Sequence, residues 1–355
     1  MKPYGRWWAA ATGIALCGCV AGRSVPVPGT ASEAMQAEIA RSRMLPPLLH
    51  RLAIPGTPAQ WQAIAADNDA EWSVKARVLA QRLGVSVQPY SVAGVTVRRV
   101  LPADADCRLR DRLVVHVHGG SYVFFGGEAG LIEAILIADR VGVPVLSIDY
   151  RMPPQHPFPA AVDDVVTVYR ELLNDYPRTS LALGGTSAGG GLALAATHAI
   201  IRLGLPSPGA LFAGTPWADL TEAGDSRRVN EGIDRVLVTA SGMLRASAQL
   251  YAGGHELTDP LVSPVYGSFE QFPPTQLVSG TRDLLLSDTV RVHRKMRAAG
   301  VPADLNVYEG VSHGDYLLVP DSPESREVHR DLSEFLRIHL NSVSDGAACS
   351  TTRIP

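Results

Sequence analysis

From residue 112 onward, short apolar runs alternate with longer segments in which apolar residues recur every three or four positions. The short runs predict buried strands, and the helical recurrence predicts amphipathic helices. Strands separated by helices at this spacing predict an α/β fold with a mostly parallel central sheet flanked by helices on both faces. The expected strands are 113–118, 145–149, 181–185, 210–215, 275–279 and 304–308, and the expected helices are 129–141, 160–173, 189–203, 287–299 and 324–340.

The chain before this alternation has a different pattern. Helical periodicity over 32–44 and 58–83 predicts an N-terminal helical cap, and 85–101 is rich in strand-forming residues. The region 222–267 interrupts the rhythm with mixed helical and polar sequence, and we expect it to form a second cap element or a wall of the pocket. The expected boundaries are 1–24 for a signal, 25–84 for the cap, 85–341 for the catalytic domain and 342–355 for a disordered tail.

The first residues are typical of an export signal. Lys2 and Arg6 precede the uncharged stretch 7–22, which is short for a membrane span and suits the apolar region of a signal peptide. Residues 16–19, Leu-Cys-Gly-Cys, resemble a bacterial lipobox, in which Cys19 would be lipidated and attach the protein to a membrane. An ordinary signal peptide or an uncleaved anchor is the alternative. We expect a cell-envelope lipoprotein or a secreted or periplasmic protein.

Composition and charge limit which binding partners and cofactors we expect. A chain of 355 residues with 46% hydrophobic residues can bury one catalytic domain and a small cap. The formal charge of −3, without a long basic run, argues against nucleic acid as a partner. Outside the signal only Cys107 and Cys349 remain, and a disulfide between them stays open. The absence of a CxxC pair gives no indication of a zinc or redox site, so we expect no metal.

A candidate nucleophile lies in Gly-Thr-Ser-Ala-Gly at 185–189, between an expected strand and an expected helix. A sharp strand-to-helix turn exposes the hydroxyl of Ser187 above the sheet, and the flanking glycines avoid clashes there. His118-Gly-Gly follows another expected strand. The N–H groups of Gly119 and Gly120, with that of Ala188 after the nucleophile, would form an oxyanion hole. A glycine-rich turn beside a buried histidine is the structural alternative for that motif.

A serine nucleophile needs a base, and the base needs an acid to orient it. The order serine, acid, histidine selects Asp283 and His313, each of which follows an expected strand. Asp288 is the rival acid, although its position at a helix start suits a first-turn charge. The other histidines are interpreted as core, surface or packing residues; they are His116, which shares a strand face with His118, and His198, His293, His329 and His339 on expected helices.

With these residues placed, the chain resembles the hormone-sensitive-lipase-like branch of bacterial esterases, also called family IV, over about residues 112–340. Within that branch it is most similar to monoterpene ε-lactone hydrolases. The resemblance is carried by His-Gly-Gly at 118–120, Asp-Tyr-Arg-Met-Pro-Pro-Gln-His-Pro-Phe-Pro-Ala at 149–160, Gly-Thr-Ser-Ala-Gly-Gly at 185–190, Pro-Trp-Ala-Asp at 216–219, Asp-Pro-Leu-Val-Ser-Pro at 259–264, Gly-Thr-Arg-Asp at 280–283 and Ser-His-Gly at 312–314.

The resemblance implies an α/β-hydrolase with an N-terminal helical cap, which acts on short acyl esters or lactones without a cofactor. It implies the triad Ser187, Asp283 and His313. Three positions depart from the family pattern: Ser121 replaces the usual third glycine, Leu284 replaces the proline after the acid, and Gln155 replaces a glutamate. The segment 149–160 is interpreted as scaffold, in which His156, with Asp164 just beyond it, bonds locally.

Aromatic residues adjoin the expected site and would form apolar walls of a substrate pocket, although such residues are also often plain packing. An amidase or peptidase would use the same triad, and a non-catalytic small-molecule binder of this fold would lack the histidine. The expected pocket residues are Tyr122, Phe124, Phe125 and Trp217.

Overall fold

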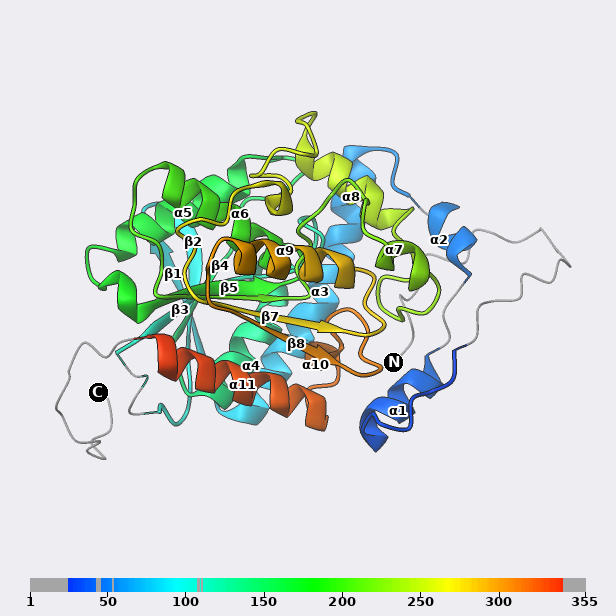
Figure 1. Cartoon of the computed structure of the whole chain (residues 1–355), viewed down its shortest axis with the longest axis horizontal. Helices are drawn as coiled ribbons and strands as arrows, with labels where there is room; N and C mark the ends of the chain where they lie inside the picture. The colour runs from blue at the N-terminus through cyan, green and yellow to red at the C-terminus, as the bar shows by residue number, and fades with distance from the viewer. Residues whose placement is uncertain (1–24, 43–45, 53, 107–108, 110, 341–355) are drawn as a thin grey trace, which may run out of the picture.

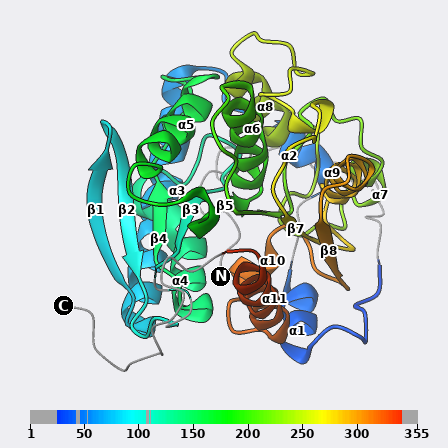
Figure 2. The ribbon, with the colours of Figure 1, turned by 60° about the vertical axis from the view of Figure 1, so that its left-hand side comes forward.

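The computed structural model describes residues 25–42, 46–52, 54–106, 109 and 111–340. The expected signal and tail, with all four cysteines, lie outside these residues. An eight-stranded sheet runs in the order β1-β2-β4-β3-β5-β6-β7-β8, and Figure 2 shows this order from left to right for the strands that it labels, all but β6. All neighbouring strands pair in parallel except β1 with β2 and β2 with β4. The strands are β1 Ser86–Val92, β2 Val95–Leu101, β3 Leu113–Val117, β4 Val145–Ile148, β5 Leu181–Thr186, β6 Ala210–Gly214, β7 Thr275–Gly280 and β8 Ala303–Tyr308.

Helices cover both faces of the sheet (Figure 1). Successive residues of β3 pack to opposite sides, because Val115 and Val117 join the core under α5 and α6 whereas Val114 joins the core under α4 and α11. The α/β fold expected from the sequence is confirmed, and the element boundaries shift by only a few residues. The covering helices are α4 Ile132–Val141 with η2 Gly127–Leu131 before it, α5 Ala160–Leu172, α6 Ala188–Arg202, α9 Leu286–Ala298 and α11 Pro323–His339.

The N-terminal residues form α1 Glu33–Arg41, α2 Pro47–Leu52 and the long α3 Pro58–Leu83. Helix α3 starts at a capping box of Thr57 and Gln60 and ends at Gly84, which has the left-handed conformation. Its buried residues line one side, which packs along η2 and α4. None of the helices in the described part of the chain is long and apolar enough to cross a membrane.

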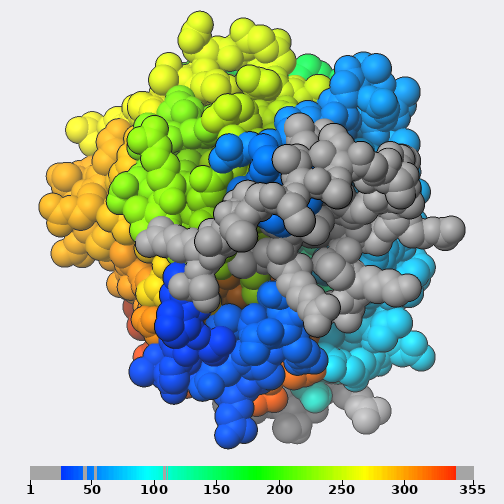
Figure 3. Space-filling model, turned by 90° about the vertical axis from the view of Figure 1, so that its right-hand side faces the viewer, coloured from blue at the N-terminus to red at the C-terminus, as the bar shows by residue number. Residues whose placement is uncertain are grey.

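Helix α1 lies against the C-terminal elements, and Figure 3 shows its blue residues beside orange ones. Met35 is fully buried and packs with Ala31 and Val311. The carboxylate of Glu324 accepts hydrogen bonds from the backbone N–H and the hydroxyl of Ser32, both at 2.7 Å. Helix α1 therefore packs on the loop after β8, and its N-cap is hydrogen-bonded to the first turn of α11.

The region 222–267 contains the short α7 Ser226–Val229, α8 Met243–Ala252, η4 Pro264–Tyr266 and irregular backbone. Tyr251 of α8 stacks on Tyr122, with ring centroids 3.8 Å apart. This region therefore packs against the loop that follows β3, where the chemistry was expected. The remaining short elements are η3 Arg178–Ser180 and α10 Asp315–Leu318.

Candidate active site

The turn between β5 and α6 holds Ser187 in an unusual backbone conformation. Its φ is +63°, which side-chain-bearing residues adopt at a cost of about 1–3 kcal/mol. The backbone N–H of Ser187 donates to the carbonyl of Gly214 at 2.8 Å, and its own carbonyl accepts from Gly191 and Trp217. The turn therefore places Ser187, which is partly exposed, at the carboxyl end of the sheet.

The glycines around this turn are required by close backbone approach. A Cβ atom on Gly185 would lie 1.9 Å from the carbonyl oxygen of Val117, and one on Gly189 would lie 2.0 Å from that same oxygen. No side chain fits at either position without moving β3 away from β5, for Gly185, or from α6, for Gly189. The end of β3 and the nucleophile turn are thus locked together.

Three residues from three different strand ends meet at this turn. The Nε2 atom of His313 lies 2.8 Å from the Oγ atom of Ser187, and its Nδ1 atom lies 2.9 Å from Oδ1 of Asp283. The other oxygen of Asp283 accepts a hydrogen bond from Ser279 at 2.7 Å. The structure therefore brings together the three residues selected from the sequence, at hydrogen-bonding distance and in a chain that runs from serine to histidine to acid.

The surroundings of His313 favour its charged form. Burial disfavours the imidazolium, but the charge and hydrogen bond of Asp283, with the charges of Asp234 and Asp315, outweigh it and raise the pKa of His313. A histidine that serves as a base must be neutral. Its basic form is therefore reached only above the ordinary histidine pKa of about 6.5.

The loop after β3 carries unengaged donors next to Ser187. In the ranges that the structure describes, the N–H groups of Gly119, Gly120 and Ala188 donate to no protein acceptor. Gly120 has a φ of +104°, and a Cβ atom there would lie 2.3 Å from the carbonyl oxygen of Phe124. A Cβ atom on Gly119 would lie 3.3 Å from the Cβ atom of Ser187, so this backbone passes close beside the nucleophile.

Comparison with known proteins identifies the family to which this architecture belongs. Residues 114–317 match the family model described as the alpha/beta hydrolase fold. The chain belongs to this α/β-hydrolase family. An acetyl-hydrolase from Streptomyces hygroscopicus is 34% identical over 248 residues, which cover 70% of this chain and 81% of that protein. An esterase from Acinetobacter venetianus is 29% identical and covers 73% and 84% of the two chains.

Solved structures give the same result for this hydrolase. The crystal structure of an esterase has a TM-score of 0.88 and 47% identity, and the alignment covers 90% of this chain and 98% of that one. An esterase from the bacterial hormone-sensitive lipase family has a TM-score of 0.70 and 29% identity over 87% of this chain and 99% of its own. Each likeness thus covers most of this chain and nearly all of the other.

A second buried carboxylate, which no motif in the sequence indicated, lies beside the acid of this α/β-hydrolase. Asp234 is fully buried, and its pKa is raised by burial and by the charge of Asp283. Its Oδ2 atom accepts the backbone N–H of Leu284 at 2.8 Å. Leu284 stands where the resemblance implies a proline, which has no N–H. This departure therefore gives the loop of the acid a hydrogen bond to Asp234.

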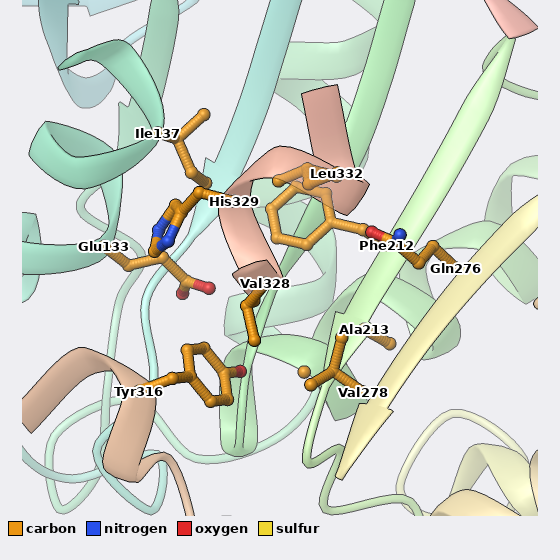
Figure 4. Close-up of a pocket in the computed structure, with 11 residues that line it drawn as sticks. Glu133, Ile137, Phe212, Ala213, Gln276, Val278, Tyr316, Val328, His329 and Leu332 are labelled. Carbon is orange, nitrogen blue, oxygen red and sulfur yellow. The ribbon is translucent and has the colours of Figure 1, made fainter. Parts of the chain in front are cut away.

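Another buried network lies beneath the nucleophile turn. The hydroxyl of Thr186 donates to Glu133 at 2.5 Å and lies 2.7 Å from the hydroxyl of Tyr316. The other oxygen of Glu133 lies 3.0 Å from Nε2 of His116, whose Nδ1 bonds to Ser147. Figure 4 shows Glu133 and Tyr316 facing a small cavity under the sheet. A glutamate within the apolar run 132–138 was the sequence signal for this network.

The four expected pocket residues divide into two pairs. Tyr122 and Trp217 are fully buried in the core, with ring centroids 5.8 Å apart, so their role in this structure is packing. Phe124 and Phe125 are partly exposed and face the N-terminal helices. The aromatic wall beside the site is therefore shared between the loop after β3 and α3.

The rival residues have other partners. Asp288 is buried and bonds to Arg227 and to the backbone N–H of Asp219, while burial raises its pKa to about 6. His116 lies in the core as expected. His118 stacks on Tyr150, and burial lowers its pKa to about 4. The described residues include no group of three or more potential metal ligands.

The segment after β4 has the local contacts expected of scaffold. The carboxylate of Asp164 accepts from the backbone N–H of Arg151 at 2.8 Å and from its guanidinium. His156 is exposed, and its backbone N–H bonds to Met152. Gln155, the third departure from the family pattern, is also exposed.

Proposed function

We propose that this chain is a carboxylic ester hydrolase that acts on short-chain acyl esters or lactones through an acyl-enzyme on Ser187. One observation carries the proposal: Oγ of Ser187 and Oδ1 of Asp283 lie 2.8 and 2.9 Å from the two ring nitrogens of the same histidine, His313. This is the arrangement in which a histidine removes the serine proton while the acid fixes its tautomer.

In the first half of the reaction, Oγ of Ser187 attacks the ester carbonyl as Nε2 of His313 takes its proton. The N–H groups of Gly119, Gly120 and Ala188 hold the oxyanion of the tetrahedral intermediate. Each such donor contributes about 3 kcal/mol to the transition state. The C–O bond to the alcohol then breaks, and His313 returns the proton to the leaving oxygen.

In the second half, His313 takes a proton from water as the water oxygen attacks the acyl-enzyme. Collapse of the second intermediate breaks the bond to Ser187, returns the proton to its oxygen and releases the acid. For a lactone, the acyl group and the alcohol belong to one molecule, so ring opening gives a single hydroxy acid. The cycle needs no cofactor and no metal ion.

Relatives support the substrate class. The acetyl-hydrolase from Streptomyces hygroscopicus and a versiconal hemiacetal acetate esterase from Emericella nidulans are both named for acetyl substrates. Ser187 is partly exposed, and the loop that begins beside it carries the partly exposed Phe124 and Phe125, which suit a small apolar acyl group. Lactones enter the proposal through the resemblance to monoterpene ε-lactone hydrolases.

The test is an assay of the protein without residues 1–24 on p-nitrophenyl esters of increasing chain length and on ε-lactones. We expect activity to be highest on short acyl chains and to fall at least 10⁴-fold in Ser187→Ala, since loss of a triad residue has an effect of about that size. Equal activity in the variant would overturn the mechanism. Turnover of anilides and not of esters would assign an amidase, and substrate binding without turnover in the wild type would assign a binder.

We also propose that the protein is exported to the cell envelope, with Cys19 as a lipid attachment site. The lipobox-like residues 16–19 after an apolar stretch support this. Cell fractionation of the full-length chain and of Cys19→Ala tests the proposal. A membrane-bound wild type and a released variant are expected, whereas a released wild type would favour an ordinary signal peptide.

A further inference from the structure

The loop after β3 is held by a carboxylate from the N-terminal helices. Asp69, near the middle of α3, accepts the backbone N–H of Phe125 at 2.6 Å on one oxygen and that of Gly126 at 3.2 Å on the other. We call residues 119–126 the oxyanion loop, since Gly119 and Gly120 begin it. The carboxylate thus fixes the far end of a loop whose first residues lie beside Ser187.

The oxyanion loop needs support from outside itself. Three residues with side chains have left-handed backbone conformations, with φ of +55° at Ser121, +64° at Tyr122 and +71° at Phe125. Such residues persist only where surrounding contacts enforce the conformation. Within the loop, the carbonyl of Gly120 accepts from Val123 and Phe124, which closes a tight turn but leaves Phe125 without a partner inside the loop.

A second carboxylate, from the sheet, accepts the next backbone N–H group after those that bond to Asp69. Oδ1 of Asp149, at the end of β4, accepts the backbone N–H of Gly127 at 2.9 Å, and Arg98 fixes its other oxygen at 2.8 Å. Three consecutive N–H groups, 125 to 127, therefore donate to two carboxylates. Only one of the two, Asp69, comes from the N-terminal helices, and burial, with the charge of Asp149, raises its pKa to about 6.

Apolar contacts place Asp69 at this position. Trp72 of α3 lies edge-on to Phe125, with ring centroids 5.2 Å apart, and Trp61 lies 6.4 Å from Phe124. A Cβ atom on Gly126 would come within 3.2 Å of a carboxylate oxygen of Asp69 and 3.3 Å of Met152. Glycine at position 126 therefore leaves room for the close approach of the carboxylate.

From these contacts we propose that Asp69 is a positioning residue for the oxyanion hole. Its carboxylate holds the oxyanion loop in the conformation that presents the N–H groups of Gly119 and Gly120 to the substrate. The N-terminal helices would then contribute to stabilising the transition state, in addition to forming walls of the pocket. This inference rests on the proposed ester hydrolysis, and its test separates the two.

The kinetic test compares Asp69→Ala, Asp69→Asn and the control Asp67→Asn, which changes an exposed aspartate on the same helix. Misplacing catalytic groups by about 1 Å costs about 100-fold, so we expect kcat of Asp69→Ala to fall about 100-fold with little change in KM. Asp69→Asn keeps one acceptor oxygen and should lose about 10-fold. The control should match the wild type.

Three kinetic results would overturn the proposal: an unchanged kcat in both Asp69 variants, a rise in KM alone, which would make Asp69 a wall of the pocket, or an equal loss in the control. If Asp69→Ala does not fold, Asp69→Asn carries the test, since it has nearly the same shape. If the wild type hydrolyses no ester, the proposed function fails while the role of Asp69 in the loop is still decided by a second measurement.

That measurement is amide hydrogen exchange of the peptide covering 119–127 in the full set of variants. Exchange should be faster in Asp69→Ala than in the wild type, because Phe125 and Gly126 lose their acceptor. It should be unchanged in Asp67→Asn and in peptides from the nucleophile turn. Equal exchange in Asp69→Ala and the wild type would overturn the proposal, whatever the activity.

Discussion

The nucleophile turn and the oxyanion loop follow neighbouring strands, β5 and β3, but different parts of the chain hold them. The nucleophile turn is fixed from within the sheet domain, by glycines pressed against Val117 and by the hydroxyl of Thr186 between Glu133 and Tyr316. The oxyanion loop has more left-handed residues, and α3 supplies a carboxylate and two aromatic rings to hold it.

The two regions show two ways of holding catalytic groups in place: steric packing of the backbone, and hydrogen bonds from another segment of the chain. Where backbones pack closely, steric clashes exclude all but one conformation of the turn. That conformation therefore depends little on the surrounding segments. A loop held by hydrogen bonds from another segment depends on how that segment is docked. We therefore expect substitutions of the residues that hold the nucleophile turn, other than Ser187 itself, to act mainly on stability. Loss of the carboxylate that holds the oxyanion loop should act mainly on catalysis.

The largest effect is expected for Gly189→Ala. Its Cβ atom would lie 2.0 Å from the carbonyl oxygen of Val117, and relief of this clash requires β3 and α6 to separate. The free energy of unfolding should fall by about 4 kcal/mol or more in urea denaturation. Gly29→Ala is the control, since no atom lies within 4 Å of its added Cβ. A loss below about 1 kcal/mol would show that the turn is not sterically locked.

Thr186→Val should have the next largest effect. The change keeps the shape of the side chain but leaves Glu133 and the hydroxyl of Tyr316 without their shared partner. We expect the free energy of unfolding to fall by about 2 kcal/mol. The control is Thr197→Val, where the buried hydroxyl donates to the carbonyl of Ala193 in its own helix. Equal losses in the two variants would show that the network of Thr186, Glu133 and Tyr316 does not stabilise the turn more than an ordinary buried hydroxyl does.

Asp234→Asn tests whether a residue outside the triad also tunes Asp283 and His313. Asp234 reaches the triad from the segment between β6 and β7, and its charge is one cause of the raised pKa of His313. Activity should rise with pH as His313 becomes neutral, with a midpoint above about 6.5 in the wild type. Loss of the charge should move that midpoint of kcat/KM down by about half a pH unit.

The control for this shift is Asp225→Asn, which changes an exposed aspartate of the same segment. Its midpoint should equal that of the wild type. A midpoint of Asp234→Asn that is unchanged or higher would mean that Asp234 does not act on the histidine through its charge.

The smallest effect is expected for Ser121→Gly on the oxyanion loop. Glycine relieves the left-handed conformation of Ser121, which is worth about 1 kcal/mol, but it gains about as much entropy in the unfolded chain. The free energy of unfolding should change by less than about 1 kcal/mol, and kcat by less than about twofold. A larger fall in kcat would show that the serine side chain itself serves the reaction.

Most of the fold was readable from the sequence, because its strands and helices have the periodicities that buried strands and amphipathic helices require. The positions of Ser187, Asp283 and His313 were readable for the same reason, since each follows a strand of the parallel sheet. Local chemistry and element order were enough to select these residues. The geometry that joins them is a consequence of the sheet.

The supporting residues were not readable in the same way. Asp69 lies in a polar stretch of a helical pattern, and nothing near it in the sequence indicates a partner more than fifty positions away. Asp234 lies in an irregular segment, where no periodicity assigns a buried side. Glu133 could have been found, because a charged residue in an apolar helix needs a buried partner and His116 lies in an equally apolar strand.

The capping box and left-handed end of α3 define a single rod of 26 residues that carries both Trp61 and Asp69. For protein engineering, such a rod is a unit of exchange: chimeras between related enzymes would have to move it together with residues 119–126 or lose the match between them. Libraries that vary the N-terminal helices to broaden the substrate range would then change kcat as well as substrate binding.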